Sequence, residues 1–441
     1  MKMMLLRRVV LLFCLLVVST SGSATLTIDI TQGVEGALPI AIVPFHWEGA
    51  EALPEDITAV IKSDLQRSGR FAPLPEQDLI ARPFEGKQIK FQNWRVLNVD
   101  NLVVGYVTYD QAKNIYRVQF QLFDVYKENQ LTGYSFQTSA GNLRRIAHRI
   151  SDIIFETLMG IRGAFDTHIA YITVGENDKA QKIYHLAIAD SDGHNEQVIY
   201  ESTQPILSPS WSPDGRHIAY VSYRRGRPEL YLQNIDTKKL RRVASYQGLN
   251  NAPAWSPKGD SLAMTLSKDG NPEIYIMNMK NNELTRITHN YAIDTEPVWL
   301  PDGRSLIFTS DRGGGPQLYR IKIGRSGAVG TAERITYEGN YNARPSVSPD
   351  GKKIAMVHQR EGDFHIAVLD TETEHLTILT ESKLDESPSF APNGSMIIYA
   401  TEHDNRGVLS AVSVDGSAKQ RLSFQQGDVR EPAWSPFRTN Y

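Results

Sequence analysis

Short runs of alternating apolar and polar residues fill most of the chain beyond residue 163. Typical runs are His217–Ser222, Glu229–Leu232 and Ser305–Ser310. Such alternation predicts half-buried β-strands, because successive side chains of a strand point to opposite faces. Polar loops rich in glycine and proline separate the runs, and no helical period interrupts them. The pattern indicates an all-β region.

This strand pattern is an internal repeat. Trp211-Ser-Pro-Asp-Gly215 is followed by five related motifs at spacings of 44, 44, 48, 43 and 44 residues. The proline and glycine of each motif suit a tight turn between two strands. A period of this length is typical of one four-stranded blade of a β-propeller. The six motifs begin at Trp211, Trp255, Trp299, Val347, Phe390 and Trp434.

The last motif is cut short, because the sequence ends at Tyr441 soon after Trp434-Ser-Pro436. The missing strands stand upstream of the first motif, at residues 168–173, 183–188 and 196–199. A C-terminal strand that completes this first blade would close the ring and leave no open edge. The alternative, an open solenoid, would leave two unpaired edges. We therefore predict a six-bladed propeller closed by the C-terminal strand.

Residues 25 to about 162 lack the repeat and mix both periods. Apolar residues at helical spacing predict a helix over 55–68, stopped at Gly69, and a second helix capped by Asn142 and ended by Gly160. Four strands are expected at residues 40–43, 102–107, 116–123 and 132–136. The predicted fold class is thus two-domain, with an α/β domain (mixed sheet, two helices) before the all-β propeller.

The first 24 residues resemble a cleaved secretory signal. Lys2, Arg7 and Arg8 precede an apolar run over residues 9–18, which is about half the length of a membrane-spanning helix. Cleavage would remove Cys14, the single cysteine, so the mature chain would form no disulfide. The expected division is 1–24 signal peptide, 25–162 α/β domain and 163–441 propeller.

The net charge and the absence of known catalytic motifs exclude several classes of function. Without the signal the chain has 44 basic and 50 acidic residues, which leaves no basic footprint for nucleic acid. We find no nucleophile elbow, phosphate-binding loop or metal-ligand spacing, and we expect no enzyme activity, no cofactor and no metal site. Two alternatives stay open: the propeller of a prolyl-oligopeptidase-like hydrolase, and a propeller that binds a small ligand in its channel.

The segments that lead into the innermost strands are the candidate binding site, because they surround one mouth of the channel. They mix carboxylates, arginines and amides, which suits a polar protein partner. The alternative is that they are capping and turn residues that any blade needs. The candidates are Asn250, Ala252, Thr295, Glu296, Arg344, Asp385, Glu386 and Arg430.

A second candidate is the mature N-terminus, which alternates polar and apolar residues before its first glycine. Such a segment can add as a strand to the edge of a partner's sheet. The alternative is an edge strand docked on its own domain. The residues are Thr25, Leu26, Thr27, Ile28, Asp29, Ile30 and Gly33.

The chain resembles the TolB family of the Tol–Pal system over essentially its whole mature length. The resemblance rests on residues 39–45, Asp294-Thr-Glu-Pro297, Asp385-Glu-Ser-Pro388 and Pro432–Pro436. It implies a periplasmic adaptor between the peptidoglycan-associated lipoprotein Pal and the inner-membrane protein TolA, peripheral to membranes and monomeric. Such an adaptor helps constrict the outer membrane at division, and some colicins exploit it. Ala252, Thr295 and Glu296 would then face Pal, and the N-terminal segment would bind TolA.

Overall fold

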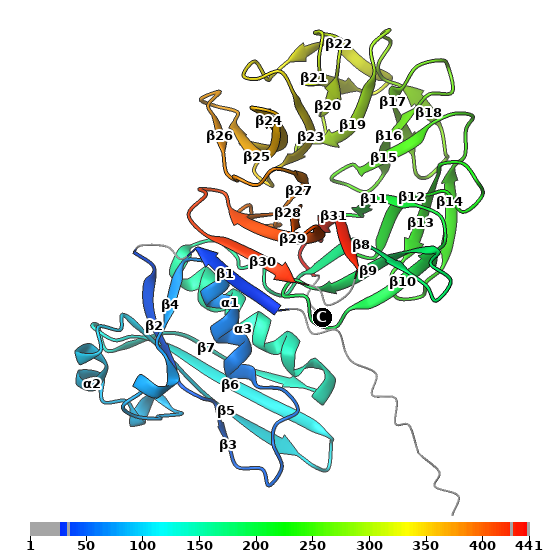
Figure 1. The fold of residues 1–441 in the computed structure, drawn as a ribbon. Helices are drawn as coiled ribbons and strands as arrows, with labels where there is room; N and C mark the ends of the chain where they lie inside the picture. The colour runs from blue at the N-terminus through cyan, green and yellow to red at the C-terminus, as the bar shows by residue number, and fades with distance from the viewer. Residues whose placement is uncertain (1–26, 33–35, 424–426, 439–441) are drawn as a thin grey trace, which may run out of the picture.

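A propeller of six sheets with an α/β unit beside it forms the molecule, as the computed structural model shows (Figure 1). The structure describes residues 27–32, 36–423 and 427–438, so the expected signal segment lies outside it. Among these residues, no helix combines the length and the apolar character needed to cross a bilayer.

Four of the blades are antiparallel sheets whose four strands follow one another in the chain. Blade 2 contains β11 (Ile206–Trp211), β12 (His217–Ser222), β13 (Glu229–Asn234) and β14 (Leu240–Ala244). Blade 3 contains β15 (Asn250–Trp255), β16 (Ser261–Leu266), β17 (Glu273–Asn278) and β18 (Leu284–Arg286). Blade 4 contains β19 (Asp294–Trp299), β20 (Ser305–Ser310), β21 (Gln317–Gly324) and β22 (Gly327–Arg334). Blade 5 contains β23 (Asn342–Val347), β24 (Lys353–Arg360), β25 (Asp363–Asp370) and β26 (Leu376–Ile378).

Blade 1 is assembled from both ends of the propeller sequence. β31 (Asp428–Trp434) pairs antiparallel with β8 (His168–Glu176), and β9 (Lys182–Asp190) and β10 (Gln197–Ser202) complete the sheet. The indole nitrogen of Trp434 donates to Thr167 Oγ1 at 2.9 Å, which ties the closing strand to the start of the blade. The predicted six blades and their closure are confirmed, and the open solenoid is wrong.

Blade 6 has five strands. To β27 (Asp385–Phe390), β28 (Met396–His403), β29 (Arg406–Ser413) and β30 (Lys419–Ser423) it adds β1 (Thr27–Gln32), which pairs antiparallel with β30. Figure 1 shows β1 along the outer edge of this blade. The alternative that the segment docks on its own α/β domain is wrong, because the strand that it pairs with belongs to the propeller. Thr25, Leu26 and Gly33 lie outside the described residues.

The Pro-x-Gly turns between the first two strands of the blades also hold neighbouring blades together. Gly259 and Gly303 have φ of 71° and 65°, in the region that a side chain disfavours. A Cβ at Gly259 would lie 3.6 Å from Pro213 in the turn of the previous blade, and one at Gly303 would lie 3.8 Å from Pro257. The turn motif therefore serves both local conformation and contact between blades.

The α/β unit contains a mixed sheet of the expected kind. Its order is β4-β2-β5-β6-β7, with β3 also paired to β5; β2 is parallel to β4 and β5, and the β5, β6 and β7 pairings are antiparallel. Strands β3 and β4 were not predicted. The strands are β2 (Leu38–Ile42), β3 (His46–Trp47), β4 (Phe71–Pro73), β5 (Asn101–Asp110), β6 (Ile115–Asp124) and β7 (Asn129–Thr138).

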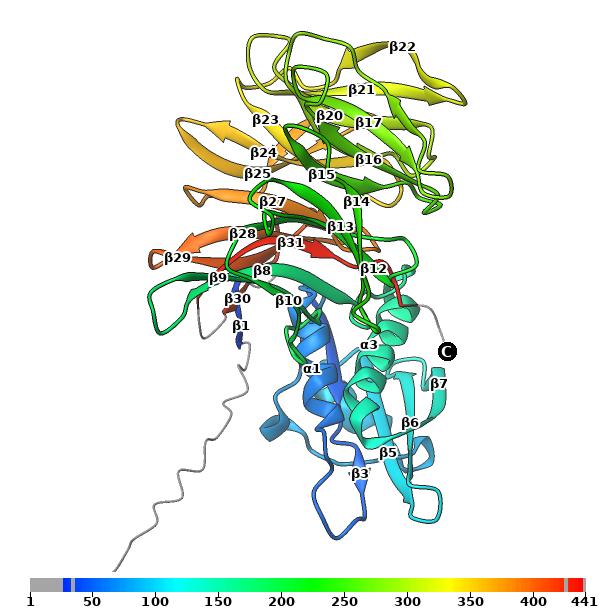
Figure 2. The same ribbon diagram turned by 90° about the vertical axis from the view of Figure 1, so that its right-hand side faces the viewer.

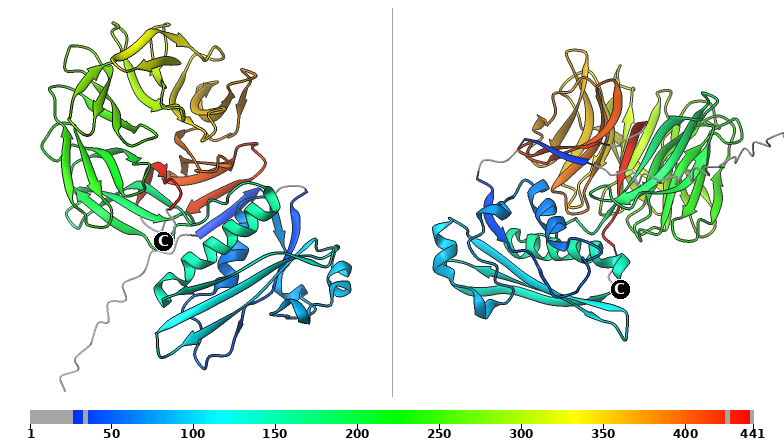
Figure 3. Two further views of the ribbon diagram at one scale, coloured as in Figure 1. Left: turned by 180° about the vertical axis from the view of Figure 1, so that it is seen from behind. Right: turned by 60° about the horizontal axis from the view of Figure 1, so that its bottom comes forward.

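Helices cover both faces of this sheet. The two predicted helices, α1 (Ile57–Arg67) and α3 (Leu143–Met159), pack on one face and lie between the sheet and the propeller (Figure 3). The other face is covered by the short α2 (Phe91–Val96), which was not predicted, through the buried Trp94. Short 3-10 turns lie at η1 (Glu76–Asp78), η2 (Gly86–Gln88) and η3 (Ala140–Asn142).

The two long helices begin and end close to the predicted positions, but the predicted cap of the second helix makes no capping bond. Asp56 caps α1 by accepting the N–H of Ala59 at 3.0 Å, and Gly160 ends α3 with φ 76°. Asn142 precedes α3 as predicted, but its side chain makes no capping bond and instead donates to Ser139 Oγ at 3.3 Å. The 3-10 turn before α3 explains the difference, because it already supplies the first bonded turn.

The α/β unit contacts the loops at one end of the blade strands. Arg67 of α1 donates to Ser191 Oγ at 2.8 Å, and Arg70 pairs with Asp415 at 2.8 Å. The carbonyl of Arg162 accepts from Asn393 at 2.9 Å. All three propeller residues lie in loops after first or third blade strands, whereas the predicted binding face lies at the opposite strand ends. Figure 2 shows the unit at one edge of the propeller, with β3 pointing away from it.

Candidate protein-binding face of the propeller

Every innermost strand contains one non-glycine residue with a positive φ, directly before a proline. The φ angles lie between 48° and 55°. At this point the pairing register shifts, so that two residues of the inner strand oppose one of the next strand, a β-bulge. The six residues are Ser208, Ala252, Glu296, Arg344, Ser387 and Glu431.

These six positions surround one cavity. Its volume is about 470 Å³, and the six bulge residues and the prolines that follow them all line it. A left-handed conformation costs an L-residue about 1–2 kcal/mol, and such strain is common at functional sites. The bulges thus hold six side chains at the channel in an arrangement that a regular strand would not give.

Hydrogen bonds and an ion pair link the charged residues of the ring to residues of neighbouring blades. A Glu296 carboxylate oxygen accepts the backbone N–H of Arg344 at 2.9 Å, and the Arg344 guanidinium lies 3.5 Å from the other oxygen. Arg344 also donates to Ser387 Oγ at 2.5 Å, which reaches the next blade. The carboxylate of Glu431 accepts the N–H of Ser208. The ring is therefore continuous around much of the channel.

Arg344 carries the positive charge of this ring among several carboxylates. Burial works to lower its pKa, but the charges of Glu296, Glu431 and Glu386 outweigh this and raise it. Burial raises the pKa of Glu431, although the charge of Arg344 opposes the shift. The mouth of the channel is thus net acidic with one fixed cation, which gives a partner both kinds of polar anchor.

Two predicted contact residues are buried inside their blades. Asn250 is 0% exposed; its side chain accepts from Tyr246 N at 2.9 Å and donates to Tyr246 O at 2.8 Å. Asp385 is also 0% exposed, and burial raises the pKa of its carboxyl group. Their side chains therefore support the turn and the blade interior and do not reach the surface. For these two residues the alternative role as capping and turn residues is the better one.

The other six predicted residues are at least partly accessible. Arg430 is 62% exposed and pairs with Asp428 at 3.3 Å, and Glu386 is exposed beside the ring. Thr295 lies partly exposed next to Glu296 in β19. Whether they contact a partner stays a prediction. The accessible set is Ala252, Thr295, Glu296, Arg344, Glu386 and Arg430.

Sequence reasoning missed Ser208, Ser387 and Glu431, although they occupy the same ring. The signal was present: each stands directly before a proline and three residues before the first residue of a repeat motif. Aligning the six motifs at that position would have selected all six bulge residues. The positive φ itself leaves no mark in the sequence, because the six bulge positions are occupied by four different residue types.

The N-terminal segment lies at a different part of the propeller. Ile28, Asp29 and Ile30 pair with Leu422, Arg421 and Gln420 of β30. Gln420 in turn donates from its side chain to the carbonyl of Arg67 in α1 at 2.7 Å. Strand β1 therefore covers an edge whose own strand contacts the α/β unit.

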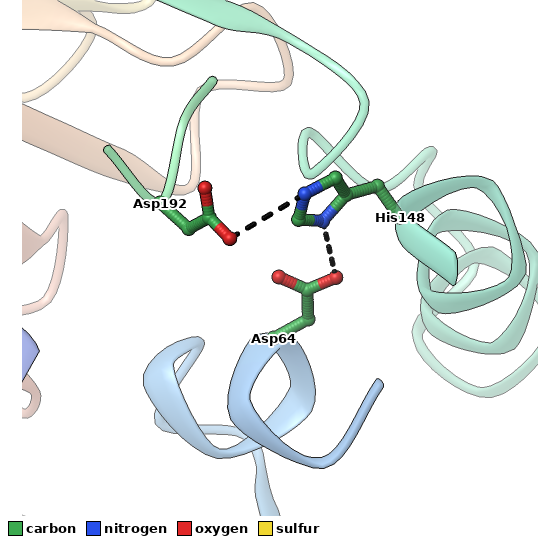
Figure 4. A group of neighbouring side chains, drawn as sticks. All are labelled: Asp64, His148 and Asp192. Atoms are coloured by element: carbon green, nitrogen blue, oxygen red, sulfur yellow. Dashed lines mark hydrogen bonds and ion pairs between the residues drawn. The ribbon is translucent and has the colours of Figure 1, made fainter. Parts of the chain in front are cut away.

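A buried cluster at the domain contact joins α1, α3 and the loop after β9. His148 Nδ1 lies 2.7 Å from Asp64, and its Nε2 lies 3.5 Å from Asp192 (Figure 4). The three side chains could geometrically hold a metal ion. However, Arg67 pairs with Asp64 at 3.1 Å and Arg144 pairs with Asp192. A cation would meet two guanidinium groups there, so we interpret the cluster as an ion-pair network between the domains.

The pKa values in the cluster fit this interpretation. Burial works to lower the pKa of His148, but contact with Asp64 and the charge of Asp192 raise it. For Asp192, burial is outweighed by the hydrogen bond with His194 and the charges of His148 and Arg144, which hold the pKa well below its usual range. The network is thus most strongly paired when the imidazole is protonated and the carboxylates are ionised.

Comparison with known proteins agrees with the fold on both domains. The family described as TolB beta propeller domain matches residues 155–438, and the TolB amino-terminal domain matches residues 26–131. A Tol-Pal system protein TolB of Nitrosococcus oceani is 57% identical over 421 residues, covering 96% of each chain. That of Thioalkalivibrio sulfidiphilus is 55% identical over 435 residues, covering 98% of each. The crystal structure of TolB from Acinetobacter baumannii has a TM-score of 0.86 at 40% identity, covering 93% of this chain and 100% of that one.

Proposed function

Since the chain belongs to the TolB family, we propose that it is a protein-binding adaptor of the Tol–Pal system. Its propeller face binds a Pal-like lipoprotein of the outer membrane, and its N-terminal segment binds TolA. It acts in the periplasm after export and removal of the signal peptide, residues 1–24. There it supports outer-membrane integrity and constriction at division. The names of its relatives support membership of the system, and the two contacts are our inference.

The ring of six bulge residues is the observation that carries the proposal. It gathers Glu296, Arg344 and Glu431 around one cavity, at the strand ends opposite the α/β unit. A rigid ring loses little conformational entropy on binding, and its fixed charges select a complementary partner. This arrangement favours a protein partner over catalysis, since the hydroxyls of Ser208 and Ser387 bond to Asn251 and Arg344 and not to a carboxylate that could act as a base.

The pairing of β1 supports the second contact. Strand β1 stands at the edge of its sheet and is held there through β30. The backbone groups that pair with β30 are the same kind that would pair with the sheet edge of a partner. Docking on the propeller and binding to TolA are therefore alternative uses of one segment, which would couple the two binding sites.

Calorimetric titration of the chain without residues 1–24 tests the first contact. We expect Glu296→Arg to weaken binding of the soluble Pal domain by about thirtyfold, because it puts a second cation beside Arg344 at a central position. Glu372→Arg, at an exposed turn of blade 5, is the matched control. Equal affinity of the Glu296 variant and the control would remove Glu296 from the site.

Removal of residues 25–36 tests the second contact. We expect the shortened chain to lose binding to soluble TolA and to bind Pal with a changed affinity, because the segment whose docking and release would couple the two sites is gone. Loss of TolA binding with unchanged Pal affinity would refute the coupling. Failure of the chain that keeps residues 25–36 to bind either protein would refute the adaptor function.

A further inference from the structure

The α/β unit contains a large cleft that the adaptor function does not use. Its volume is about 990 Å³, and it lies between β3, the loop that follows it, and the last residues of β5. Figures 1 and 2 show β3 at the end of the unit that points away from the propeller. The cleft is thus remote from both the channel mouth and β1.

Aromatic rings form the walls of this cleft. His46 stacks on Phe84 with ring centroids 4.4 Å apart, and Phe84 meets Tyr106 edge-on at 6.3 Å. On the other side Tyr116 lies 6.1 Å from Trp47 and 4.6 Å from Tyr109. The rings support one another in two groups, so the aromatic part of the cleft wall is held by ring contacts.

The loop beside Trp47 is shaped to keep the cleft open. The indole nitrogen of Trp47 donates to the carbonyl of Glu51 at 2.7 Å. A Cβ at Gly49 would lie 2.0 Å from the indole ring, so only glycine allows the loop to pass this close. This close fit holds Trp47 in position at the cleft wall.

The charged groups that line the cleft are all acidic. They are Glu48, Glu51, Glu85 and Asp110, and no lysine or arginine is among the lining residues. Lys87 pairs with Glu85 at 2.6 Å and Lys113 lies 3.7 Å from Asp110, both from outside the cleft, while His46 contacts Glu48 at 3.0 Å. Within residues 36–423 no ion pair reaches Glu51. The cleft therefore attracts positive charge.

One side of the cleft is an open strand edge. His46 and Trp47 of β3 pair in parallel with Tyr106 and Val107 of β5. Among the described residues no strand pairs with the other edge of β3. An extended chain can add to such an edge through its backbone, with alternate side chains directed to the pockets beside it.

From these features we propose that the cleft binds an extended, basic segment of a partner protein. Its backbone pairs with β3, and a lysine or arginine side chain lies between the carboxylates of Glu48 and Glu51 and the faces of Trp47 and Tyr116. Such a cation gains both ion pairing and cation–π attraction, which neither an anionic nor a neutral ligand would gain. The site is independent of the propeller face, so it allows a third partner to be held at the same time.

Fluorescence anisotropy with labelled L-hexalysine as the probe tests this on the chain without residues 1–24. We expect Glu48→Gln/Glu51→Gln to weaken binding about tenfold, because two carboxylate contacts are lost. The control is Glu372→Gln/Glu374→Gln, which removes two exposed carboxylates from blade 5 and should leave affinity unchanged. All-D hexalysine should bind several-fold more weakly, since its backbone cannot pair in the same way with β3.

Fluorine NMR of the chain labelled with 5-fluorotryptophan locates the contact. Trp47 is one of six tryptophans, and Trp47→Phe identifies its resonance. We expect hexalysine to shift this resonance and hexaglutamate to leave it unmoved.

Equal weakening in both double variants, equal binding of the D-peptide, or an unmoved Trp47 resonance would overturn the proposal. A shift caused by chitotetraose but not by hexalysine would also overturn it, and would identify a glycan site. Pal and TolA binding should survive in the cleft variant, which separates this test from that of the adaptor function.

Discussion

Asp192→Asn should weaken the contact between the propeller and the α/β unit while leaving each of them folded. Asp192 is 4% exposed and lies in the loop after β9. Its carboxylate pairs with Arg144, lies 3.5 Å from His148 Nε2, and accepts the N–H of His194 at 3.1 Å. The amide keeps the shape of the side chain and removes its charge, so the change isolates the electrostatic part of the contact.

The size of the effect follows from what the two cations keep. Removal of one partner of a buried ion pair typically costs about 3–5 kcal/mol, because the other charge is left uncompensated. Here Arg144 keeps Glu55 at 2.9 Å, and His148 keeps Asp64 at 2.7 Å. We therefore expect a loss below that range, about 2–3 kcal/mol. Asp236→Asn, at an exposed position of the propeller, should change stability by less than about 0.5 kcal/mol.

Calorimetry and limited proteolysis together measure this loss. In the parent chain we expect the two domains to unfold in closely spaced transitions, because their interface couples them. In Asp192→Asn the transition of the α/β unit should move to lower temperature, and trypsin should cleave faster after Arg162, whose guanidinium lies 4.1 Å from the Phe437 ring in the parent. Unfolding and cleavage rates equal to those of Asp236→Asn would refute the assignment of Asp192 to an interdomain ion-pair network.

Three further predictions concern stability. The pKa of His148 is raised by its contacts with Asp64 and Asp192, against the effect of burial, and burial raises that of Asp152 to about 7. Both groups bind protons more tightly in the folded chain. Between about pH 4 and 7 the loss of stability through Asp152 is opposed by His168, whose pKa burial lowers to about 3, so we expect the melting temperature to fall with rising pH above about 6.5, through His148. His148→Gln should flatten the upper part of this profile, and a profile identical to that of the parent would contradict the shift. Ala252→Gly, at φ 48°, should raise the free energy of unfolding by about 0.5–1 kcal/mol, since relief of the left-handed strain exceeds the added chain entropy; a lower urea midpoint would argue against strain at the bulge. Trp299→Phe should cost about 1 kcal/mol more than Trp255→Phe, because Trp299 Nε1 donates to Ala254 O of the previous blade at 3.2 Å, whereas Trp255 Nε1 has no hydrogen-bond partner among the residues that the structure describes. Equal urea midpoints for the two variants would show that the bond between blades contributes nothing.

The sequence by itself determined the architecture of the propeller. The turn motifs recur at nearly constant spacing, and each one has a local physical cause: proline sets one backbone angle and glycine accepts another. A truncated final motif together with three unpaired upstream strands was enough to predict closure by β31. Local and periodic signals of this kind can be recognised in the sequence, because they do not depend on which distant segments come into contact.

Only the tertiary structure decided which residues meet across the fold. Alternation predicted that residues 27–30 form a strand, but not that its partner is β30, almost four hundred residues away. Polarity suggested that Asn250 and Asp385 face a partner, yet packing of the blade buries both. Likewise Asp64, His148 and Asp192 come from three elements, with nothing in their spacing to connect them. Hydrophobic patterning specifies which face of an element is covered; the identity of the covering element is set by the three-dimensional arrangement alone.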